Sequence, residues 1–264
     1  MSVAVLVFDS VTKLPPQADG AVVIGGSHGA VYAAHLSAMA GCRAAIHHDA
    51  GIGRNEAGVS GLAYADKLGM AMAAVATASA RIGDGADLQA RGLISRANAL
   101  ATRCGVVPGM SVRDATEVLK KAPWPHVLPS AKGESRHLVE GVVCADSASL
   151  LVPGDRGRLV ATGSHGALNA AQATAPFQPL LLMFNDAGFG ADRGGVLALP
   201  KLDEHGIAAL AVAAQSACIG DGRSTLQDGI ISDANAAAYR LGARVGGSAL
   251  ALARVVAEKR ENAS

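Results

Sequence analysis

The same polar and glycine residues occur twice along this chain, at a constant separation of 137 positions. Ser27-His28-Gly29 returns as Ser164-His165-Gly166, and Asp49-Ala50-Gly51 returns as Asp186-Ala187-Gly188. The register needs no gap from Asp9 to about Lys121. Because a repeat of this length is too long for a solenoid, it predicts an internally duplicated chain, with two similar lobes related by a pseudo-two-fold axis.

The repeat also sets the expected domain boundaries. We predict a first α/β repeat at 1–122, a linker at 123–142 and a second α/β repeat at 143–264. The linker carries several prolines, the single tryptophan, Trp124, and a polar run at 132–136. Proline and polar clusters of this kind are typical of connecting segments.

Short apolar runs alternate with alanine-rich segments in each repeat. In the first repeat we expect strands at 3–8, 21–24, 43–47 and 70–76, and helices at 30–39, 55–68, 87–104 and 111–121. The second repeat follows the same order and ends in a clear helix at 248–259. The alternation predicts an α/β fold, in which each lobe has a mostly parallel, doubly wound sheet flanked by helices.

Composition excludes several classes of function. The formal charge of +1 and the 3 % aromatic content give no electrostatic or stacking basis for binding nucleic acid. Apolar runs are too short for a membrane helix, and the N-terminus lacks the basic start of a signal peptide. The four cysteines form no C-x-x-C pair, which is typical of reduced thiols. We therefore expect a cytoplasmic protein that acts on a small molecule, without a membrane or nucleic-acid partner.

Polar side chains follow the predicted strands, where parallel strands place ligand sites. Asp9-Ser10, Ser27-His28, Asp49 and Ser79 each come directly after an apolar run. Asp and Ser are also ordinary caps of the helix that follows a strand. The pattern thus predicts either a polar ligand site along one edge of the sheet or a set of caps.

The turn around Ser27-His28 carries most of this information. Gly25-Gly26-Ser27-His28-Gly29 matches G-x-S-x-G between a strand and a helix, which is the setting of a nucleophilic serine. The copy has Thr162 in place of the first glycine, and the strand order differs from that of the α/β hydrolases. Anion binding at the helix start, or a purely structural turn, remains an alternative. The turn is neither a Walker A loop nor G-x-G-x-x-G, so no nucleotide cofactor is expected.

Differences between the repeats indicate where a specific site would lie. His47-His48 becomes Phe184-Asn185, and Arg81, a candidate carboxylate clamp, becomes Cys218. The predicted catalytic residues are Ser27, His28, Asp49, Ser164, His165 and Asp186. The predicted substrate-binding residues are Gly26, Gly29, His48, Arg54, Ser79, Arg81, Gly163, Gly166 and Ser216. The spacing of His28, His47 and His48 matches no zinc pattern, so no metal is predicted.

These residues predict a cofactor-independent enzyme acting on a small, anionic metabolite such as a carboxylate or cyclic amide. Ser27 or Ser164 would be the nucleophile or oxyanion donor, and His28 or His165 the acid and base, oriented by Asp49 or Asp186. Hydrolysis is the favoured reaction. A racemase, isomerase or lyase using the same groups and a non-catalytic ligand-binding protein are the alternatives. Small residues on the helix faces also predict a homo-oligomer.

Overall fold

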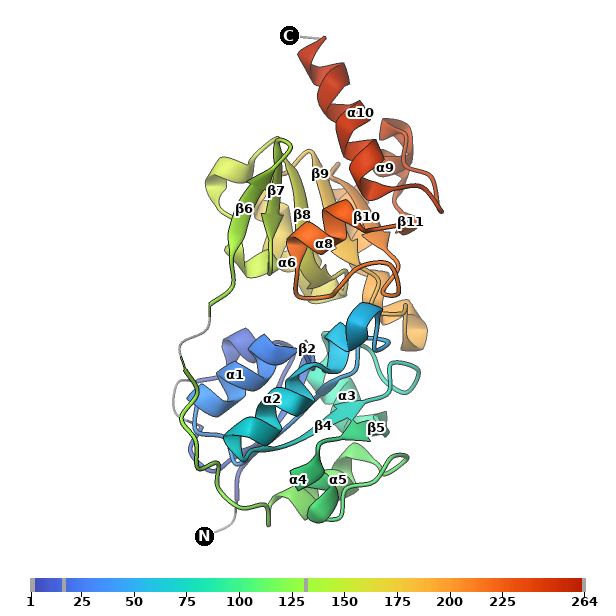
Figure 1. Ribbon diagram of the computed structural model, residues 1–264. Helices are drawn as coiled ribbons and strands as arrows, with labels where there is room; N and C mark the ends of the chain where they lie inside the picture. The colour runs from blue at the N-terminus through green and yellow to red at the C-terminus, as the bar shows by residue number, and fades with distance from the viewer. Residues whose placement is uncertain (1–2, 16–17, 131–132, 263–264) are drawn as a thin grey trace. The chain divides into compact units, whose positions relative to one another are not determined.

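Two separate β-sheets organise the chain, which places it in the α/β class (Figure 1). The computed structural model describes residues 3–15, 18–130 and 133–262. Contacts divide the chain into a first unit, Met1–Ile52 with Glu56–Gly133 and Gly190–Asp192, and a second unit, Glu134–Phe189 with Arg193–Ser264 and Gly53–Asn55. In the described part of the chain, no helix has the length and apolar character needed to cross a membrane.

The first unit contains a five-stranded sheet. Its strands, in both chain and spatial order, are β1 (Val5–Phe8), β2 (Val22–His28), β3 (Ala44–His48), β4 (Ala71–Val75) and β5 (Ile94–Ala97). The first four are parallel, and β5 is antiparallel to β4. The strand order does not reverse within the sheet, so it lacks the switch point of the predicted doubly wound arrangement.

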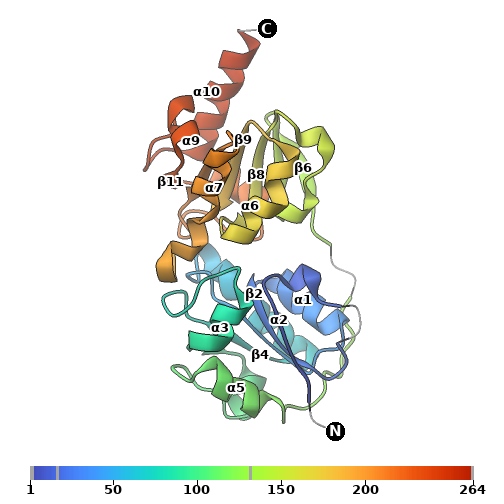
Figure 2. The same ribbon diagram turned by 180° about the vertical axis from the view of Figure 1, so that it is seen from behind.

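Helices cover both faces of this sheet (Figures 1 and 2). They are α1 (Val31–Met39), α2 (Gly61–Leu68), α3 (Gly85–Arg91), α4 (Ala99–Arg103) and α5 (Val112–Leu119), with short 3-10 turns η1 (Val11–Lys13) and η2 (Arg54–Val59). Alternate strand residues point to opposite faces. Ile24 and Ile46 therefore pack in the core under α3 and α5, whereas Val23 and Ala45 lie in the clusters under α1 and α2.

The second unit contains a six-stranded sheet in the order β11-β10-β9-β8-β7-β6. Its strands are β6 (Arg136–Val139), β7 (Val142–Ala145), β8 (Leu159–His165), β9 (Leu181–Asn185), β10 (Ala208–Val212) and β11 (Ile231–Ala234). The four inner strands are parallel, and the edge strands β6 and β11 are antiparallel to their neighbours.

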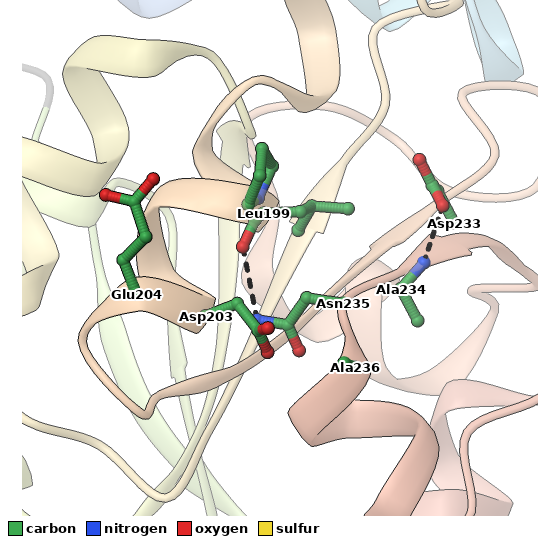
Figure 3. Close-up of a pocket in the computed structure, with 8 residues that line it drawn as sticks. Leu199, Asp203, Glu204, Asp233, Ala234, Asn235 and Ala236 are labelled. Carbon is green, nitrogen blue, oxygen red and sulfur yellow. Dashed lines mark hydrogen bonds between the residues drawn. The ribbon is translucent and has the colours of Figure 1, made fainter.

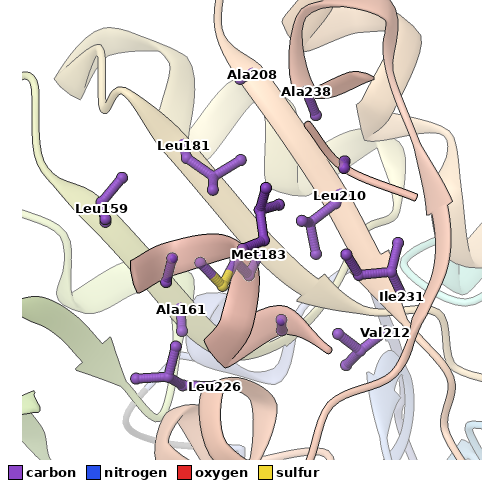
Figure 4. Packing of buried hydrophobic residues seen from close by; sticks show 14 of the residues in the cluster. Leu159, Ala161, Leu181, Met183, Ala208, Leu210, Val212, Leu226, Ile231 and Ala238 are labelled. Carbon is purple, nitrogen blue, oxygen red and sulfur yellow. The ribbon is translucent and has the colours of Figure 1, made fainter. Parts of the chain in front are cut away.

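Two cores cover this second sheet as well. Its helices are α6 (Leu168–Thr174), α7 (Ala198–Glu204), α8 (Gly222–Gln227), α9 (Ala236–Leu241) and α10 (Ala249–Glu261), with 3-10 turns η3 (Ala148–Leu150), η4 (Pro153–Asp155), η5 (Ala175–Phe177) and η6 (Ala191–Val196). One core packs α8, α9 and α10 on Met183 and Leu210 (Figure 4). The other packs α6 and α7 on Phe184.

Most expected elements form within a few residues of their predicted limits, but two differ. The helix expected at 55–68 starts as the 3-10 turn η2 and is α-helical only from Gly61. The helix expected at 87–104 is divided into α3, the strand β5 and α4. The helix stops at Gly92, where a Cβ atom would lie 2.4 Å from the Leu88 carbonyl oxygen. Ile94 then pairs with Val75 of β4, and Asn98 caps the next helix by accepting from Ala101 N–H.

The segment expected as a linker contributes to the second sheet. Within 123–142, β6 pairs with β7 in an antiparallel hairpin, and residues 131–132 lie outside the described part. Trp124 packs in the first unit, where its ring contacts the turn at Gly20. The long helix expected at 248–259 is present as α10, capped by Ser248 Oγ.

Candidate functional site at the carboxyl ends of the strands

Strand β2 ends in a bulge that holds Ser27. Gly25 pairs with His47 of β3, and the next paired residue is His28, opposite His48, so Gly26 and Ser27 are extra residues. The bulge turns Ser27 inward, where its Oγ accepts a 2.9 Å hydrogen bond from Val11 N–H at the start of η1. Among the described residues its hydroxyl proton finds no acceptor.

The second sheet has the same bulge and the same bond. Ala161 pairs with Met183, and the next pair joins His165 to Asn185. Ser164 Oγ accepts from Ala148 N–H at 2.9 Å, just as Ser27 accepts from Val11. A serine at this position thus fixes the start of a 3-10 turn in both units while its own O–H remains available.

The predicted binding glycines are required by close backbone packing. A Cβ on Gly26 would lie 2.6 Å from Asp84 N, and one on Gly163 would lie 2.4 Å from Asp221 N. Their carbonyl oxygens accept from Gly83 and Gly220 N–H at 2.8 and 2.7 Å. Each bulge is therefore pressed against the turn that begins α3 or α8. This contact explains the repeated Ile-Gly-Asp-Gly sequence without a ligand.

Gly29 and Gly166 pack against backbone in the same manner. A Cβ at Gly29 would lie 3.1 Å from Gly58 O, and one at Gly166 would lie 2.9 Å from Gly195 O. Gly29 N–H donates to His48 O at 2.7 Å, which fixes the exit from β2. These glycines shape the turn that carries Ser27 and Ser164.

Asp49 and Asp186 hold the loops that follow β3 and β9. Asp49 Oδ1 accepts from Gly51 and Thr77 N–H, both at 3.0 Å. Asp186 Oδ1 accepts from Gly188 N–H at 2.8 Å and Ala214 N–H at 2.9 Å. In the described part of the chain, no hydrogen bond links Asp49 with His28 or Ser27. The predicted triad is thus not assembled by direct hydrogen bonds.

His48 makes two hydrogen bonds that fix its tautomer. Its Nε2–H donates to Ala80 O at 3.0 Å, and its Nδ1 accepts from Ala50 N–H at 3.0 Å. Asn185 occupies the matching position and bonds with Ala217 O and Ala187 N–H in the same way. Burial is the main cause that lowers the pKa of His48. His48 is therefore a neutral brace between two loops.

The Nδ1 atoms of His28 and His47 are both buried without a hydrogen-bond partner among the described residues. Burial, and then repulsion by any charge on His48, lower the pKa of His28 to about 4. Burial likewise lowers the pKa of His47 to about 4, and His47 contacts Ser37 Oγ at 3.1 Å. His165 Nδ1 instead accepts from Ala167 N–H at 3.3 Å. At neutral pH the His28 ring is an uncharged proton acceptor.

The remaining predicted residues are bonded within their own units. Ser79 Oγ donates to Ala76 O and accepts from Leu93 N–H, and Ser216 Oγ makes the matching pair of bonds to Ala213 and Ile230. Arg81 pairs with Asp84 at 3.0 Å and Asp87 at 3.3 Å. Arg54 is grouped with the second unit, where it donates to Ser216 O at 2.8 Å.

Sequence reasoning missed Glu134, which precedes β6. Burial, and then the charge of Asp146, raise the pKa of Glu134 to about 7, opposed by a hydrogen bond from Ser147. Asp146 follows β7, so this carboxylate pair lies at the same edge of the sheet as Ser164, whose Oγ binds the neighbouring Ala148. Glu134 has no counterpart 137 positions earlier, so the repeat could not reveal it.

An acidic hollow of about 350 Å³ lies at the opposite edge of the second sheet (Figure 3). Asp203 accepts from Ala237 N–H, Asp233 pairs with Arg193, and Asn235 donates to Leu199 O. The bonds of Asp203 and Asn235 join α7 to the start of α9, and the ion pair of Asp233 joins β11 to η6. The hollow therefore follows from helix capping, and it contains none of the predicted site residues.

No metal-binding cluster of three or more His, Cys, Asp or Glu occurs in the described ranges. The fold and the edge residues define an α/β protein with a polar edge at the carboxyl ends of its parallel strands. Comparison of the chain with protein-family models, curated proteins and solved structures finds no match in any of the three.

Proposed function

We propose that the chain is a hydrolase of the ester or amide type, acting without a cofactor on a small polar metabolite at the carboxyl end of β2. The observation that carries this proposal is the pair of adjacent, uncommitted groups at Ser27 and His28. Ser27 Oγ is held by Val11 N–H but keeps its proton for a ligand. The His28 ring is uncharged at neutral pH, and its Nδ1 has no described hydrogen-bond partner.

The hydrogen bonds favour Ser27 as an oxyanion donor over Ser27 as a nucleophile, because no described bond links its hydroxyl to a base. In the proposed reaction, Ser27 O–H donates to the substrate carbonyl oxygen while water attacks the carbonyl carbon. Neutral His28 takes the proton of that water and returns it to the leaving nitrogen or oxygen as the scissile bond breaks. Asp49 acts indirectly, by fixing the loop after β3.

Glu134 favours a second candidate function, proton transfer by a racemase, isomerase or lyase. A carboxyl group with a pKa of about 7 can give or take a proton at neutral pH. In that reaction Glu134 would remove a proton α to a carboxylate, Ser164 O–H would stabilise the enolate oxygen, and the carbon would then regain a proton from the Glu134 carboxyl group or from water.

We also propose that the two units are copies of one ancestral unit. The support is the set of hydrogen bonds that recur 137 residues apart, those of Ser27 and Ser164, Asp49 and Asp186, and His48 and Asn185. This relation supplies a matched control for each variant. The location of the protein in the cytoplasm and its assembly as a homo-oligomer stay predictions.

The test uses the full chain with 4-nitrophenyl acetate, succinimide and N-acetylglycine as hydrolysis probes. Ser27→Ala should lower kcat/KM about 10²–10³-fold, and His28→Asn about 10²–10⁴-fold. Ser164→Ala removes the equivalent backbone contact but should change kcat/KM less than about threefold, as should His165→Asn. Circular dichroism and thermal melting check that each variant is folded.

Retention of wild-type turnover by folded Ser27→Ala and His28→Asn would overturn the proposed site, and a wild type inactive on all three probes would contradict the ester or amide class. Proton transfer is tested separately by NMR, through deuterium incorporation at Cα of alanine or aspartate in D₂O. Exchange that Glu134→Gln abolishes and His28→Asn leaves intact would favour the second candidate.

A further inference from the structure

We propose that the second unit binds a small, multiply charged oxyanion, a phosphate compound or a polycarboxylate, in a pocket separate from the Ser27 and Ser164 turns. The pocket has a volume of about 430 Å³ and lies where β7 and β8 begin. Arg156, Arg158, Arg260 and Glu261 line it, together with Gly157 and Ala257. We call it the arginine pocket.

Charge in the arginine pocket is unbalanced. Arg156 and Arg158 are exposed, and within the described residues neither side chain donates a hydrogen bond or lies within ion-pair distance of a carboxylate, although the charge of Arg158 acts on Asp155 from farther away. Nearby carboxylates are already used, since Asp155 binds Arg136 and Glu140 binds Arg254 through two bonds. Among the described residues that line the pocket, Glu261 is the one carboxylate. An anion entering the pocket would therefore meet excess positive charge.

The backbone that carries these arginines is fixed on both sides. Gly157 N–H donates to Gln178 O at 2.9 Å, and Arg158 N–H donates to Asp155 O at 3.0 Å. Arg260 on α10 reaches across and donates from Nη1 to Gly157 O at 2.9 Å. The turn is thus held between η5 and the last helix. Arg156 and Arg158 therefore project from a fixed frame, which lowers the entropic cost of binding.

The turn at Gly157 does not by itself create the pocket, as the corresponding turn of the first unit shows. Gly20, 137 positions before Gly157, has the same left-handed conformation, with φ values of 70° and 67°. A Cβ on Gly20 would lie 2.6 Å from the Trp124 ring, and Arg43 stacks on that ring at 5.1 Å. A Cβ on Gly157 would meet no atom of the described residues within 4 Å. An aromatic ring closes the first turn, whereas the second is open.

The residues next to the two glycines also favour an anion site in the second unit and not in the first. Gly20 lies between Asp19 and Ala21, whereas Gly157 lies between Arg156 and Arg158. Planar guanidinium groups bind phosphate and carboxylate oxygens through paired hydrogen bonds. The volume falls in the range of small-molecule sites. None of the described residues that line the pocket is aromatic, so the charged oxygens of the ligand are the groups recognised.

The pocket and the Ser164 turn lie at opposite ends of β8, because Leu159 begins the strand and His165 ends it. Seven residues of strand span about 20 Å. A ligand in the arginine pocket therefore cannot touch Ser164. Binding there would not depend on the proposed hydrolase activity.

Isothermal titration of the full chain with pyrophosphate and with citrate, at constant ionic strength, tests the proposal. We expect saturable binding of at least one probe. Arg158→Ala and Arg156→Ala should each weaken the Kd about tenfold or more, and Arg158→Lys should weaken it less, because one charge remains. Arg113→Ala, an exposed arginine on α5 of the first unit, is the matched control and should leave the Kd unchanged.

Preference for pyrophosphate would assign the phosphate class, and preference for citrate the polycarboxylate class. Absence of saturable binding by both probes at millimolar concentration would overturn the proposal. Unchanged affinity in a folded Arg156→Ala/Arg158→Ala double variant would also overturn it. An equal loss of affinity in Arg113→Ala would show non-specific attraction to the surface instead of a site.

Discussion

Single side chains along the sheet edges differ in how many of their polar atoms the fold itself uses. Asp49, Ser79 and His48 each hydrogen-bond to backbone groups, and the same bonds recur in the second unit. Ser27 Oγ accepts one hydrogen bond, from Val11 N–H, and the Nδ1 of His28 has no hydrogen-bond partner among the described residues. The residue identities at strand ends were visible in the sequence. Their hydrogen-bond saturation was not, because the partners are backbone groups up to 32 residues away.

Replacing His48 tests whether its two hydrogen bonds to backbone groups stabilise the fold. His48→Asn should keep the free energy of unfolding within about 1 kcal/mol of the wild type, because Asn185 makes the same two bonds in the second unit. His48→Ala leaves Ala50 N–H and Ala80 O buried without partners and should cost about 2–4 kcal/mol. Urea unfolding measures both. Equal destabilisation by Asn and Ala would contradict the brace role.

At the scale of elements, each strand bulge packs against the turn that begins the neighbouring helix, α3 in the first unit and α8 in the second. The sequence predicted the parallel strands well, since buried apolar runs of four to six residues mark them clearly. It predicted β5 wrongly, because Ile94–Ala97 is too short to show a period, and its pairing with Val75 and Ala74 is a tertiary contact. Gly92 and the capping Asn98 were the available signals for a break.

A methyl group on Gly26 tests the packing of the β2 bulge against the start of α3. Gly26→Ala would place a Cβ 2.6 Å from Asp84 N and 2.7 Å from Asp9 O, both backbone atoms, so the bulge or the start of α3 must shift. We expect a loss of about 1–3 kcal/mol in unfolding free energy. Gly154→Ala, where a Cβ meets no atom within 4 Å, is the control and should cost less than about 0.5 kcal/mol. A Gly26→Ala protein as stable as this control would show that the bulge is pliable.

For the whole molecule, the two units contain different titrating groups in similar folds. The first unit has His28, His47 and His48 on β2 and β3, with pKa values lowered mainly by burial. The second unit has Phe184 and Asn185 at the positions of His47 and His48, and it has Glu134, whose pKa is raised to about 7. The sequence showed that these residues differ between the units. Only the structure shows the burial that lowers the pKa values of the histidines and raises the pKa of Glu134.

Acid should therefore act oppositely on the two units. Between pH 6.5 and about 4 the unfolded histidines take up protons that folded His28 and His47 refuse, so the first unit loses stability as pH falls. Folded Glu134 holds a proton up to about pH 7, whereas its unfolded form loses it near 4.5. Its contribution is thus present below 4.5 and lost as pH rises through 7, which stabilises the second unit on acidification.

Hydrogen exchange with mass spectrometry, corrected for intrinsic rates, measures each unit separately. From pH 7 to 5, protection of peptides covering β2 and β3 should fall, while protection of those covering β8 and β9 should hold or rise. Glu134→Gln should remove the pH dependence that Glu134 gives to the second unit. A parallel loss of protection in both units would contradict the assignment of these groups.

The packing of Trp124 on Gly20 has a practical consequence. Trp124 is the single tryptophan of the chain, and it lies in the first unit with Arg43 stacked on its ring. Its fluorescence is therefore a native reporter of that unit, and the stacked cation makes the emission sensitive to local opening. The second unit contains no tryptophan, so when tryptophan alone is excited, a chemical label placed in the second unit would let a single sample report the two units at separate wavelengths.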